Sequence, residues 1–295
     1  MKNKTIIISS FRNMTQSSKR FISLLFMALL GVGFYAGISS TSQDMLSTLD
    51  TYLDQSNAHD LQIQSTLGLS KADVASLEKL SDINSVQGVY TKDELIEPVL
   101  NKAATRQKDE TAIAKVIGMP DKLDKISLAK GRLPKKNNEI VVEAAYLTKH
   151  KMKLGDSLKI TDSDLTNETF KIVGTVKSPL YFSKVNRGTT SLGDGQIDYF
   201  MYVKPSVFQQ DAYSAITLTV KGANQEITSQ TAYLDKISVA KKEVESIKEV
   251  QEKQRFETVY ADYLNPTAVA SGLVKRDSLP PAKWYITDRQ DDTGY

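Results

Sequence analysis

One uninterrupted apolar segment near the N-terminus constrains the architecture of this chain most strongly. Residues Phe21–Ile38 read FISLLFMALLGVGFYAGI without a charged side chain, and Ser39 and Ser40 extend the run. A helix of about 20 residues, rising 1.5 Å per residue, crosses the ~30 Å hydrocarbon layer of a bilayer. The segment therefore predicts a transmembrane helix over residues 21–40.

The charges on the two sides of this segment differ in sign. The basic residues on its N-terminal side are Lys2, Lys4, Arg12, Lys19 and Arg20, with no acidic residue among them. On the other side, aspartates alone precede the first basic residue, Lys71. Because cytoplasmic flanks carry the excess of lysine and arginine, we expect residues 1–20 to be a cytoplasmic juxtamembrane segment. The chain after about residue 40 is then extracytoplasmic, held at the cell membrane.

A cleaved signal peptide is the alternative interpretation of the same segment. It would need a shorter apolar region followed by a small-x-small cleavage site, and Gly37-Ile38-Ser39 fits that pattern loosely. The basic N-terminal region is long for a signal peptide, and Thr5–Phe11 (TIIISSF) favours contact with membrane lipid at the inner surface. We therefore favour the membrane anchor.

Small residues recur along the predicted membrane helix. Gly33 and Gly37 form a small-xxx-small pair, and Ala36 lies beside them. Such a face allows a second helix to approach the backbone closely. We expect helix packing at these three residues, although glycine is also frequent in membrane helices that have no such partner.

The chain that follows begins with a strand–helix–strand pattern. Asp44–Leu53 continues the helix, and Leu61–Gln64 alternates like a strand with one buried face. Ser70, with an aspartate three residues on, is a capping signal for a helix, and Asp82–Val89 is the next strand. Residues 41–110 are thus expected to form the strand–helix–strand part of an α+β core.

Residues 111–222 have a β-rich pattern and are expected to form an inserted lobe together with return strands. The strand-like runs are Ala112–Ile117, Glu139–Val142, Ser157–Thr161, Phe170–Val176, Asp198–Val203 and Ala215–Val220. Most glycines and prolines fall between these runs. Gly174 lies inside one of them, which predicts a bulge or a close backbone approach.

A long helix and a final strand follow. Within residues 223–275, apolar residues recur at three- and four-residue spacing from Gln225 to about Tyr260, which predicts a long amphipathic helix. The pattern leaves open whether this helix projects away from the domain or lies on its sheet. Residues 276–295 contain a strand-like run, Ala282–Thr287, expected to return towards the membrane.

Composition narrows the possible chemistry. The 38 basic and 35 acidic residues nearly cancel, so nucleic acid is not an expected partner. The absence of cysteine excludes disulfides, iron–sulfur clusters and a thiol nucleophile. No phosphate-binding glycine loop is present outside the apolar segment, so we expect no bound cofactor and no ATP hydrolysis by this polypeptide.

Residues that could carry catalysis or metal binding are few. His59 and His150 lack the spacing of a zinc pair and the G-x-S-x-G context of a serine hydrolase. We expect both histidines at the surface and no enzymatic activity. Asp162, Asp164 and Asn167 could ligate calcium, but they lack the glycine and distal glutamate of an EF-hand loop, so a solvated turn is favoured.

A group of aromatic residues could line a groove for an apolar or peptide ligand. Core packing is the simpler interpretation, and we favour it. The residues concerned are Tyr181, Phe182, Tyr199, Phe200 and Tyr202.

Several sequence segments, taken in chain order, resemble segments of one protein family. RFISLLFMALLGVGFYAGISSTSQDM is similar to the first membrane helix of FtsX-like ABC transporter permeases. TLGLSKADVASLEKLSDINSVQGVY resembles the opening of their extracytoplasmic MacB-type periplasmic core domain, and GRLPKKNNEIVVE, LGDSLKI and FKIVGTVKSPLYFS resemble its β-rich lobe. The long charged helix and WYITDRQDDTGY resemble a Gram-positive branch of the family.

The resemblance implies a permease subunit that works by mechanotransmission. A cytoplasmic ABC ATPase subunit would drive motion of the membrane helices, and the outer domain would pass it to an extracytoplasmic substrate or protein. A second permease copy would complete a dimer within membrane lipid. Because the family has three further membrane helices, we expect this chain to be the N-terminal portion of a longer permease.

Two other classes of function remain open from the sequence. A single-pass membrane-anchored binding module would act without transport and without an ATPase partner. A surface enzyme would depend on His59, His150 or a serine.

Overall fold

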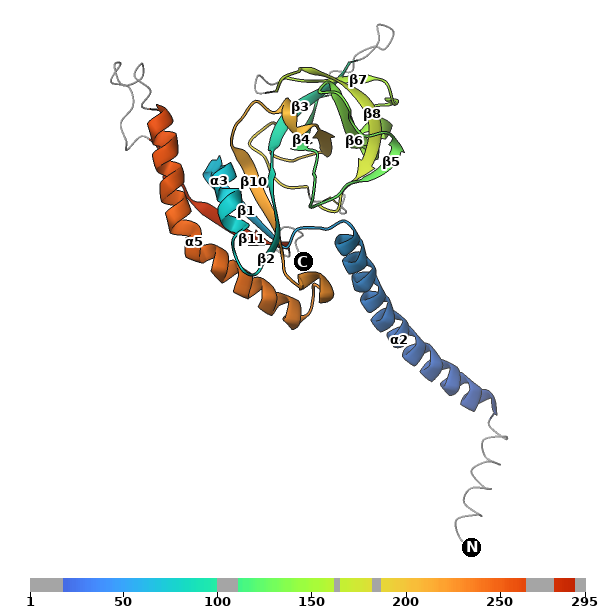
Figure 1. Cartoon of the computed structure of the whole chain (residues 1–295). Coiled ribbons are helices and arrows are strands. Elements are labelled where there is room, and N and C mark those ends of the chain that lie inside the picture. Colours follow the sequence, from blue (N-terminus) through green and yellow to red (C-terminus); the bar gives the residue numbers. More distant parts are fainter. Residues whose placement is uncertain (1–17, 100–110, 162–164, 182–186, 264–278, 290–295) are drawn as a thin grey trace. The chain divides into compact units, whose positions relative to one another are not determined.

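The computed structural model describes residues 18–99, 111–161, 165–181, 187–263 and 279–289. The chain divides into two compact units, Met1–Thr51 and Tyr52–Tyr295. Figure 1 traces the elements in chain order.

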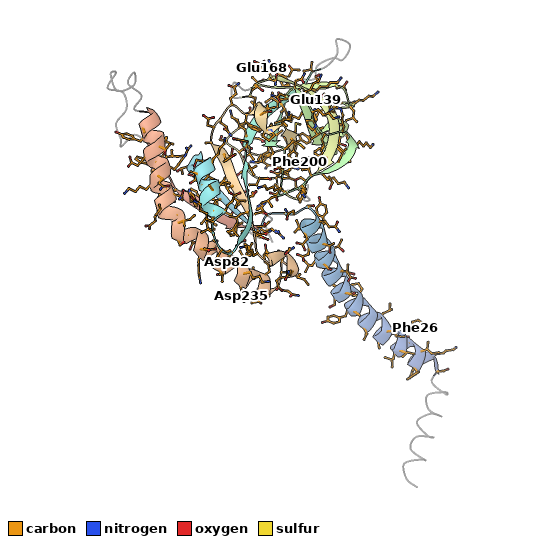
Figure 2. All side chains as sticks on the ribbon, viewed as in Figure 1. Phe26, Asp82, Glu139, Glu168, Phe200 and Asp235 are labelled. Carbon is orange, nitrogen blue, oxygen red and sulfur yellow. The ribbon has the colours of Figure 1, made fainter. Side chains whose placement is uncertain are left out.

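Helix α2, Ser18–Gln55, is the one described helix that is long and apolar enough to cross a membrane. None of its most apolar stretch is buried inside the protein. Phe26, for example, is 62% exposed and projects away from the helix (Figure 2). The predicted apolar helix is therefore confirmed, and it continues through Asp44–Leu53 as expected.

The last turn of α2 belongs to the second unit and ends in a left-handed residue. Asn57 has a φ of 49°, and its N–H donates to the carbonyl of Asp54. The N–H of Ala58 reaches back 2.9 Å to the carbonyl of Leu53. This arrangement satisfies carbonyl groups at the helix end and turns the chain sharply.

A four-stranded antiparallel sheet forms one half of the second unit. Its order is β11-β1-β10-β2. The strands are β1 (Leu61–Leu69), β2 (Ile83–Val89), β10 (Tyr213–Val220) and β11 (Trp284–Asp288). The three strands predicted around residues 61–64, 82–89 and 215–220 are confirmed, and the predicted final strand is β11.

Two helices cover one face of this sheet (Figure 1). Helix α3, Lys71–Leu77, begins with a capping box in which Ser70 and Asp73 bond each other's backbone N–H, as the sequence predicted. Helix α5, Thr231–Tyr263, buries Tyr233, Ile237, Ala240 and Val244 against the sheet. Of the two possibilities for this helix, packing on the sheet is the one observed.

Helix α5 begins later than the predicted Gln225. The reason is local, because Gly222 is left-handed at φ 69° and Ala223–Gln225 form a separate 3₁₀ turn, η2. The chain therefore changes direction before the helix starts.

A seven-stranded sheet forms the other half, in the order β5-β8-β6-β9-β4-β3-β7. Since β7 also pairs with β8, all strands except β5 close into a barrel, and β5 flanks β8. The strands are β3 (Thr91–Val99), β4 (Ala112–Gly118), β5 (Ser127–Gly131), β6 (Glu139–Glu143), β7 (Ser157–Ile160), β8 (Thr169–Lys177) and β9 (Tyr199–Val203). Helix α4 (Ala144–Lys149) and the turn η1 (Pro205–Val207) complete the half.

The barrel is filled by side chains, among them Ile140, Phe170 and Met201, and Tyr146 of α4 packs with them. A second apolar cluster contains Phe200 and Tyr202. Tyr181 stacks on Phe200 with ring centroids 4.8 Å apart. This agrees with the core interpretation of the aromatic group; Phe182 lies outside the described residues.

Gly174 is both a bulge and a close approach. The register of β6 against β8 shifts between Ile140 and Val141, which places Gly174 opposite Val141. A Cβ at Gly174 would lie 2.6 Å from the carbonyl oxygen of Arg132. The prediction made from its position inside a strand is confirmed.

The α+β prediction holds at the level of a mixed fold with one apolar N-terminal helix and a β-rich unit. Strands β3 and β5 and helix α4 were not predicted. In β3, charged residues obscure the alternation, and Asp93 instead pairs with Lys115 directly opposite on β4 at 2.9 Å.

Candidate functional site

The residues predicted to set topology and helix packing all belong to the first unit. Lys19 and Arg20 lie in the first turn of α2 and are exposed. The other predicted topology residues, Lys2, Lys4 and Arg12, lie outside the described residues. The structure therefore leaves the orientation as a prediction.

Gly33, Ala36 and Gly37 lie exposed on α2. A shallow groove runs past Gly33, Gly37 and Thr41, and a Cβ at either glycine would meet no atom within 4 Å. Thr41 Oγ1 donates to the carbonyl of Gly37 at 2.7 Å. The backbone is thus open to a second helix on this face, and the partner stays a prediction.

The segment with Asp162, Asp164 and Asn167, for which a solvated turn is favoured over a calcium site, is only partly described. Asp162 and Asp164 lie outside the described residues, and the amide of Asn167 donates to Thr166 Oγ1 at 3.0 Å. Among the residues that the structure describes, no three histidine or carboxylate side chains are grouped to hold a metal ion.

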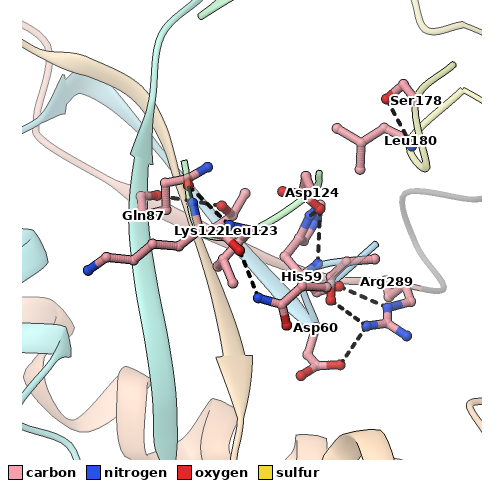
Figure 3. A network of polar contacts seen from close by, with 12 residues as sticks. His59, Asp60, Gln87, Lys122, Leu123, Asp124, Ser178, Leu180 and Arg289 are labelled. Carbon is pink, nitrogen blue, oxygen red and sulfur yellow. Dashed lines mark hydrogen bonds and ion pairs between the residues drawn. The ribbon is translucent and has the colours of Figure 1, made fainter. Parts of the chain in front are cut away.

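A buried polar cluster lies where the second unit begins and where its last described strand ends (Figure 3). We call it the junction cluster, and its members are His59, Asp60, Asp124, Tyr233 and Arg289. His59 and Asp60 join α2 to β1, and Arg289 follows β11 directly. Four segments distant in sequence therefore meet through polar side chains.

Arg289 ties the end of β11 to the residues before β1. Its Nε donates to the carbonyl of His59 at 2.8 Å, and its Nη2 donates to the carbonyl of Ala58 at 2.6 Å. The same Nη2 lies 2.9 Å from Asp60 Oδ1. These charge-assisted hydrogen bonds compensate for removing a guanidinium from water.

The Asp60 carboxylate is held from several sides. Its Oδ2 accepts the N–H of Val220 on β10 at 2.8 Å, and its Oδ1 accepts the hydroxyl of Tyr233 on α5 at 2.9 Å. Burial, and the neighbouring Asp60 charge after it, raise the pKa of Tyr233 far above its ordinary value. Tyr233 is therefore a neutral donor that links helix α5 to the cluster.

His59 is buried at 3% exposure, so its predicted surface position is wrong. Its Nδ1 lies 2.8 Å from Asp124 Oδ1, and the same oxygen accepts the His59 N–H. Asp124 has a φ of 56°, a left-handed conformation that aspartate tolerates. The error arises because the partner carboxylate lies 65 residues away in sequence.

The loop that carries Asp124 is fixed in turn to the sheet. The side-chain carbonyl of Gln87 on β2 accepts the N–H groups of Asp121, Lys122 and Leu123 at 2.7 to 3.1 Å (Figure 3). Asn57 Nδ2 donates to the carbonyl of Lys122. The segment after α2 is therefore held between this loop and Arg289.

A small polar cavity of about 50 Å³ adjoins the cluster and is lined partly by Asp54, Asp60, Asn84 and Arg289. This volume accommodates a water molecule rather than a substrate. With the guanidinium and carboxylate bound to backbone groups, the cluster is suited to hold chain segments together rather than to attack a substrate.

His150 also departs from the predicted surface position. It is half-buried, with its ring 4.6 Å from the ring of Tyr146 and 5.8 Å from that of Tyr199. His150 ends helix α4, and its ring packs on Tyr146, which belongs to the barrel core. This packing accounts for the partial burial of His150.

No protein-family model matches the sequence, and no curated protein matches it. Solved structures with a similar fold include the periplasmic region of MacB from Actinobacillus actinomycetemcomitans, at 12% identity and a TM-score of 0.39. That match covers 79% of this chain and 89% of the MacB chain.

A second similar structure is the extracellular domain of the noncanonic ABC-type transporter YknZ from Gram-positive bacteria. Its identity to this chain is 14% and its TM-score is 0.36, with 56% of this chain and 85% of that chain covered. The two solved structures are thus a periplasmic region and an extracellular domain.

Sequence reasoning missed the junction cluster. In the sequence, Asp60 is one of the aspartates that follow the apolar helix, and Arg289 lies within WYITDRQDDTGY; neither is predicted to belong to a site. The available signal was a charged residue, Asp60, directly before the apolar strand β1, and a second charged residue, Arg289, directly after strand β11. It becomes meaningful only once β1 and β11 are known to pair, with Leu61 opposite Asp288.

Proposed function

We propose that this chain serves in an ABC transporter permease subunit whose outer domain transmits ATP-driven motion to a substrate or partner outside the membrane. Helix α2 is the observation that carries the proposal. None of its apolar stretch is buried inside the protein, and its last turn is followed directly by the chain that carries His59 and Asp60. A membrane helix joined in this way to a folded unit can pass on displacement.

The hydrogen bonds of the junction define what such displacement would reach. Residues 56–60 follow α2 and contact Arg289 on one side and the loop with Asp124 on the other. Movement of these residues would act on β1 and β11 and on the loop fixed to β2. Such coupling is a rigid-body or hinge mechanism.

The proposed partners follow from the same assignment. A cytoplasmic ABC ATPase subunit would supply the motion, and a second permease copy would pack on Gly33, Ala36 and Gly37. Membrane lipid would surround Phe21–Ile38, with the N-terminus in the cytoplasm and residues after about 40 outside. We propose no catalytic role, cofactor or nucleic-acid partner for this chain.

A fluorophore attached to one engineered cysteine tests the proposal, because the chain has no native cysteine. Ser238→Cys, on an exposed position of α5, is labelled in the permease reconstituted with its ATPase in nanodiscs. We expect the fluorophore emission to change when ATP is added. With an ATPase variant that cannot hydrolyse ATP, we expect no repeated cycles of this emission change. No change with an active ATPase bound would contradict the proposal and favour an anchored binding module.

A proline in the membrane helix gives the matched variant. Ala36→Pro removes one backbone hydrogen bond and clashes with the preceding turn, at a cost of about 3 kcal/mol to the helix. We expect the ATP response to be lost while the emission of Trp284, the single tryptophan, remains that of the folded outer unit. Ala36→Ser is the control, because it keeps both the helix and a small side chain on the packing face. An undiminished response in Ala36→Pro would show that α2 does not transmit the motion.

A further inference from the structure

Strand β5 is an exposed edge of the seven-stranded sheet. Within the described part of the chain it pairs with β8 alone, and all five of its residues, Ser127–Gly131, are exposed. Leu128 is 45% exposed. The outer side of an edge strand presents a row of N–H and C=O groups that can pair with another strand.

Positive charge is concentrated around this edge. Lys130 lies on β5 and Lys125 two residues before it, and both are exposed. A third exposed lysine, Lys177, lies opposite Ser127 on β8. No carboxylate of the described residues forms an ion pair with any of the three, whereas the neighbouring Arg132 is bound by Glu139. We call β5 with these lysines the basic edge.

The C-terminal end of β5 packs closely against β8. Gly131 has a φ of 80°, and its backbone lies against Val173 and Gly174, so that an added Cβ would lie 2.3 Å from the carbonyl of Val173. The N–H of Arg132 donates to that carbonyl at 3.0 Å. A preformed edge loses little conformational freedom when a partner strand binds.

The charges discriminate between possible partners. Lysine on an edge strand opposes pairing of two copies of the same edge, because like charges would face each other. The same lysines attract carboxylates. The edge therefore disfavours self-association and favours an extended acidic chain.

We propose that the basic edge binds an extended acidic segment of another protein, which adds to the sheet as a strand beside β5. Backbone hydrogen bonds supply affinity in this mode, and side-chain contacts supply specificity. Carboxylates of the added strand contact the lysines, and an apolar side chain contacts Leu128. This inference goes beyond transmission of motion and holds without it.

Fluorescence anisotropy with a defined probe tests the proposal. The probe is a fluorescein-labelled peptide of alternating glutamate and valine, and the protein is the full chain in nanodiscs of neutral lipid. Combined Lys125→Glu, Lys130→Glu and Lys177→Glu should weaken binding by about tenfold or more, since three charge contacts are reversed. Lys241→Glu, Lys242→Glu and Lys253→Glu on α5, with the same change of charge, should leave binding within about twofold.

Two further probes separate strand addition from simple charge attraction. The same peptide carrying N-methyl groups on successive residues keeps its charge but cannot donate those backbone hydrogen bonds, so its binding should be lost. Equal binding of the methylated peptide, or of a lysine–valine peptide, would overturn the proposal. So would loss of peptide binding in phosphatidylglycerol nanodiscs at unchanged ionic strength, because anionic lipid would then be the occupant.

Discussion

Asp60 and Arg289 form a buried ion pair that joins the ends of two neighbouring strands. Arg289 Nη2 lies 2.9 Å from Asp60 Oδ1, although 229 residues separate the two in sequence. Their side chains are 4% and 8% exposed, respectively. The N–H of Arg289 also donates to the carbonyl of Asp60 at 3.0 Å. The pair thereby fixes β11 to the chain that arrives from α2.

Arg289→Met should destabilise the outer unit strongly. The substitution keeps much of the apolar stem but leaves the Asp60 carboxylate buried without its cation, which costs about 3–5 kcal/mol. Urea unfolding followed by the emission of Trp284 on β11 measures the change in the free energy of unfolding. The double variant Asp60→Asn with Arg289→Met should be more stable than Arg289→Met alone, since no unpaired charge remains. If Arg289→Met lowers the free energy of unfolding by less than about 1 kcal/mol, the pair is not important for stability.

Replacements of Asp124 should separate its backbone conformation from its side-chain bond. Asp124→Asn keeps an acceptor for His59 and a residue that tolerates a φ of 56°, so we expect a loss of about 1 kcal/mol or less. Asp124→Val removes the acceptor and places a β-branched residue in a left-handed conformation, so we expect a loss of about 3 kcal/mol or more. Thermal unfolding of both variants measures the difference, and equal midpoints would contradict this role of Asp124.

The elements that could be predicted from the sequence are those determined by nearby residues. The capping box of Ser70 and Asp73 depends on residues three apart, and the bulge at Gly174 depends on a glycine inside a strand pattern. The buried positions of His59, Asp60 and Arg289 depend on pairing of distant strands. Local patterns carry no information about which strands pair, so the junction cluster could not be predicted.

Gly174→Ala should detach β5 from the barrel. The new Cβ would lie 2.6 Å from the carbonyl of Arg132 and 2.8 Å from that of Lys130, and backbone atoms cannot move aside as a flexible side chain can. We expect a loss of about 1–3 kcal/mol and faster hydrogen exchange in β5. Gly118→Ala is the control in the same sheet, because its Cβ would meet its nearest neighbour at an ordinary 3.6 Å. Unchanged exchange in β5 would contradict the close approach.

The missed strands show a second limit of sequence patterns. Strand β5 has Leu128 as its one large apolar residue and buries none of its positions, so no alternation marks it. In β3, Lys92, Asp93 and Glu94 interrupt the apolar pattern, yet Glu94 is 4% exposed. Such strands form because their neighbours supply the pairing, and a period-two pattern cannot reveal that.

Acid should weaken one identifiable ion pair. Two hydrogen bonds from Arg132, at 2.6 and 2.7 Å, and the N–H of Lys135 hold the pKa of Glu139 well below its ordinary value. Because the pKa of Glu139 is lower in the folded state, its ionised carboxylate stabilises the protein at pH values above the ordinary glutamate pKa of about 4.3. This stabilisation is lost progressively as the pH falls below that value. The stability difference between the native chain and Glu139→Gln should therefore be constant from pH 7 to 5 and shrink below about pH 4. A difference independent of pH would contradict this assignment.

The most direct test of the account is the side of the membrane on which the outer unit lies. Single cysteines at Ser238, exposed on α5, and at Ser18, at the start of α2, can be labelled in intact cells with a membrane-impermeant maleimide. We predict that Ser238→Cys is labelled in intact cells and Ser18→Cys only after permeabilisation. Labelling of Ser18→Cys but not Ser238→Cys in intact cells would place the folded unit in the cytoplasm and contradict the proposed function.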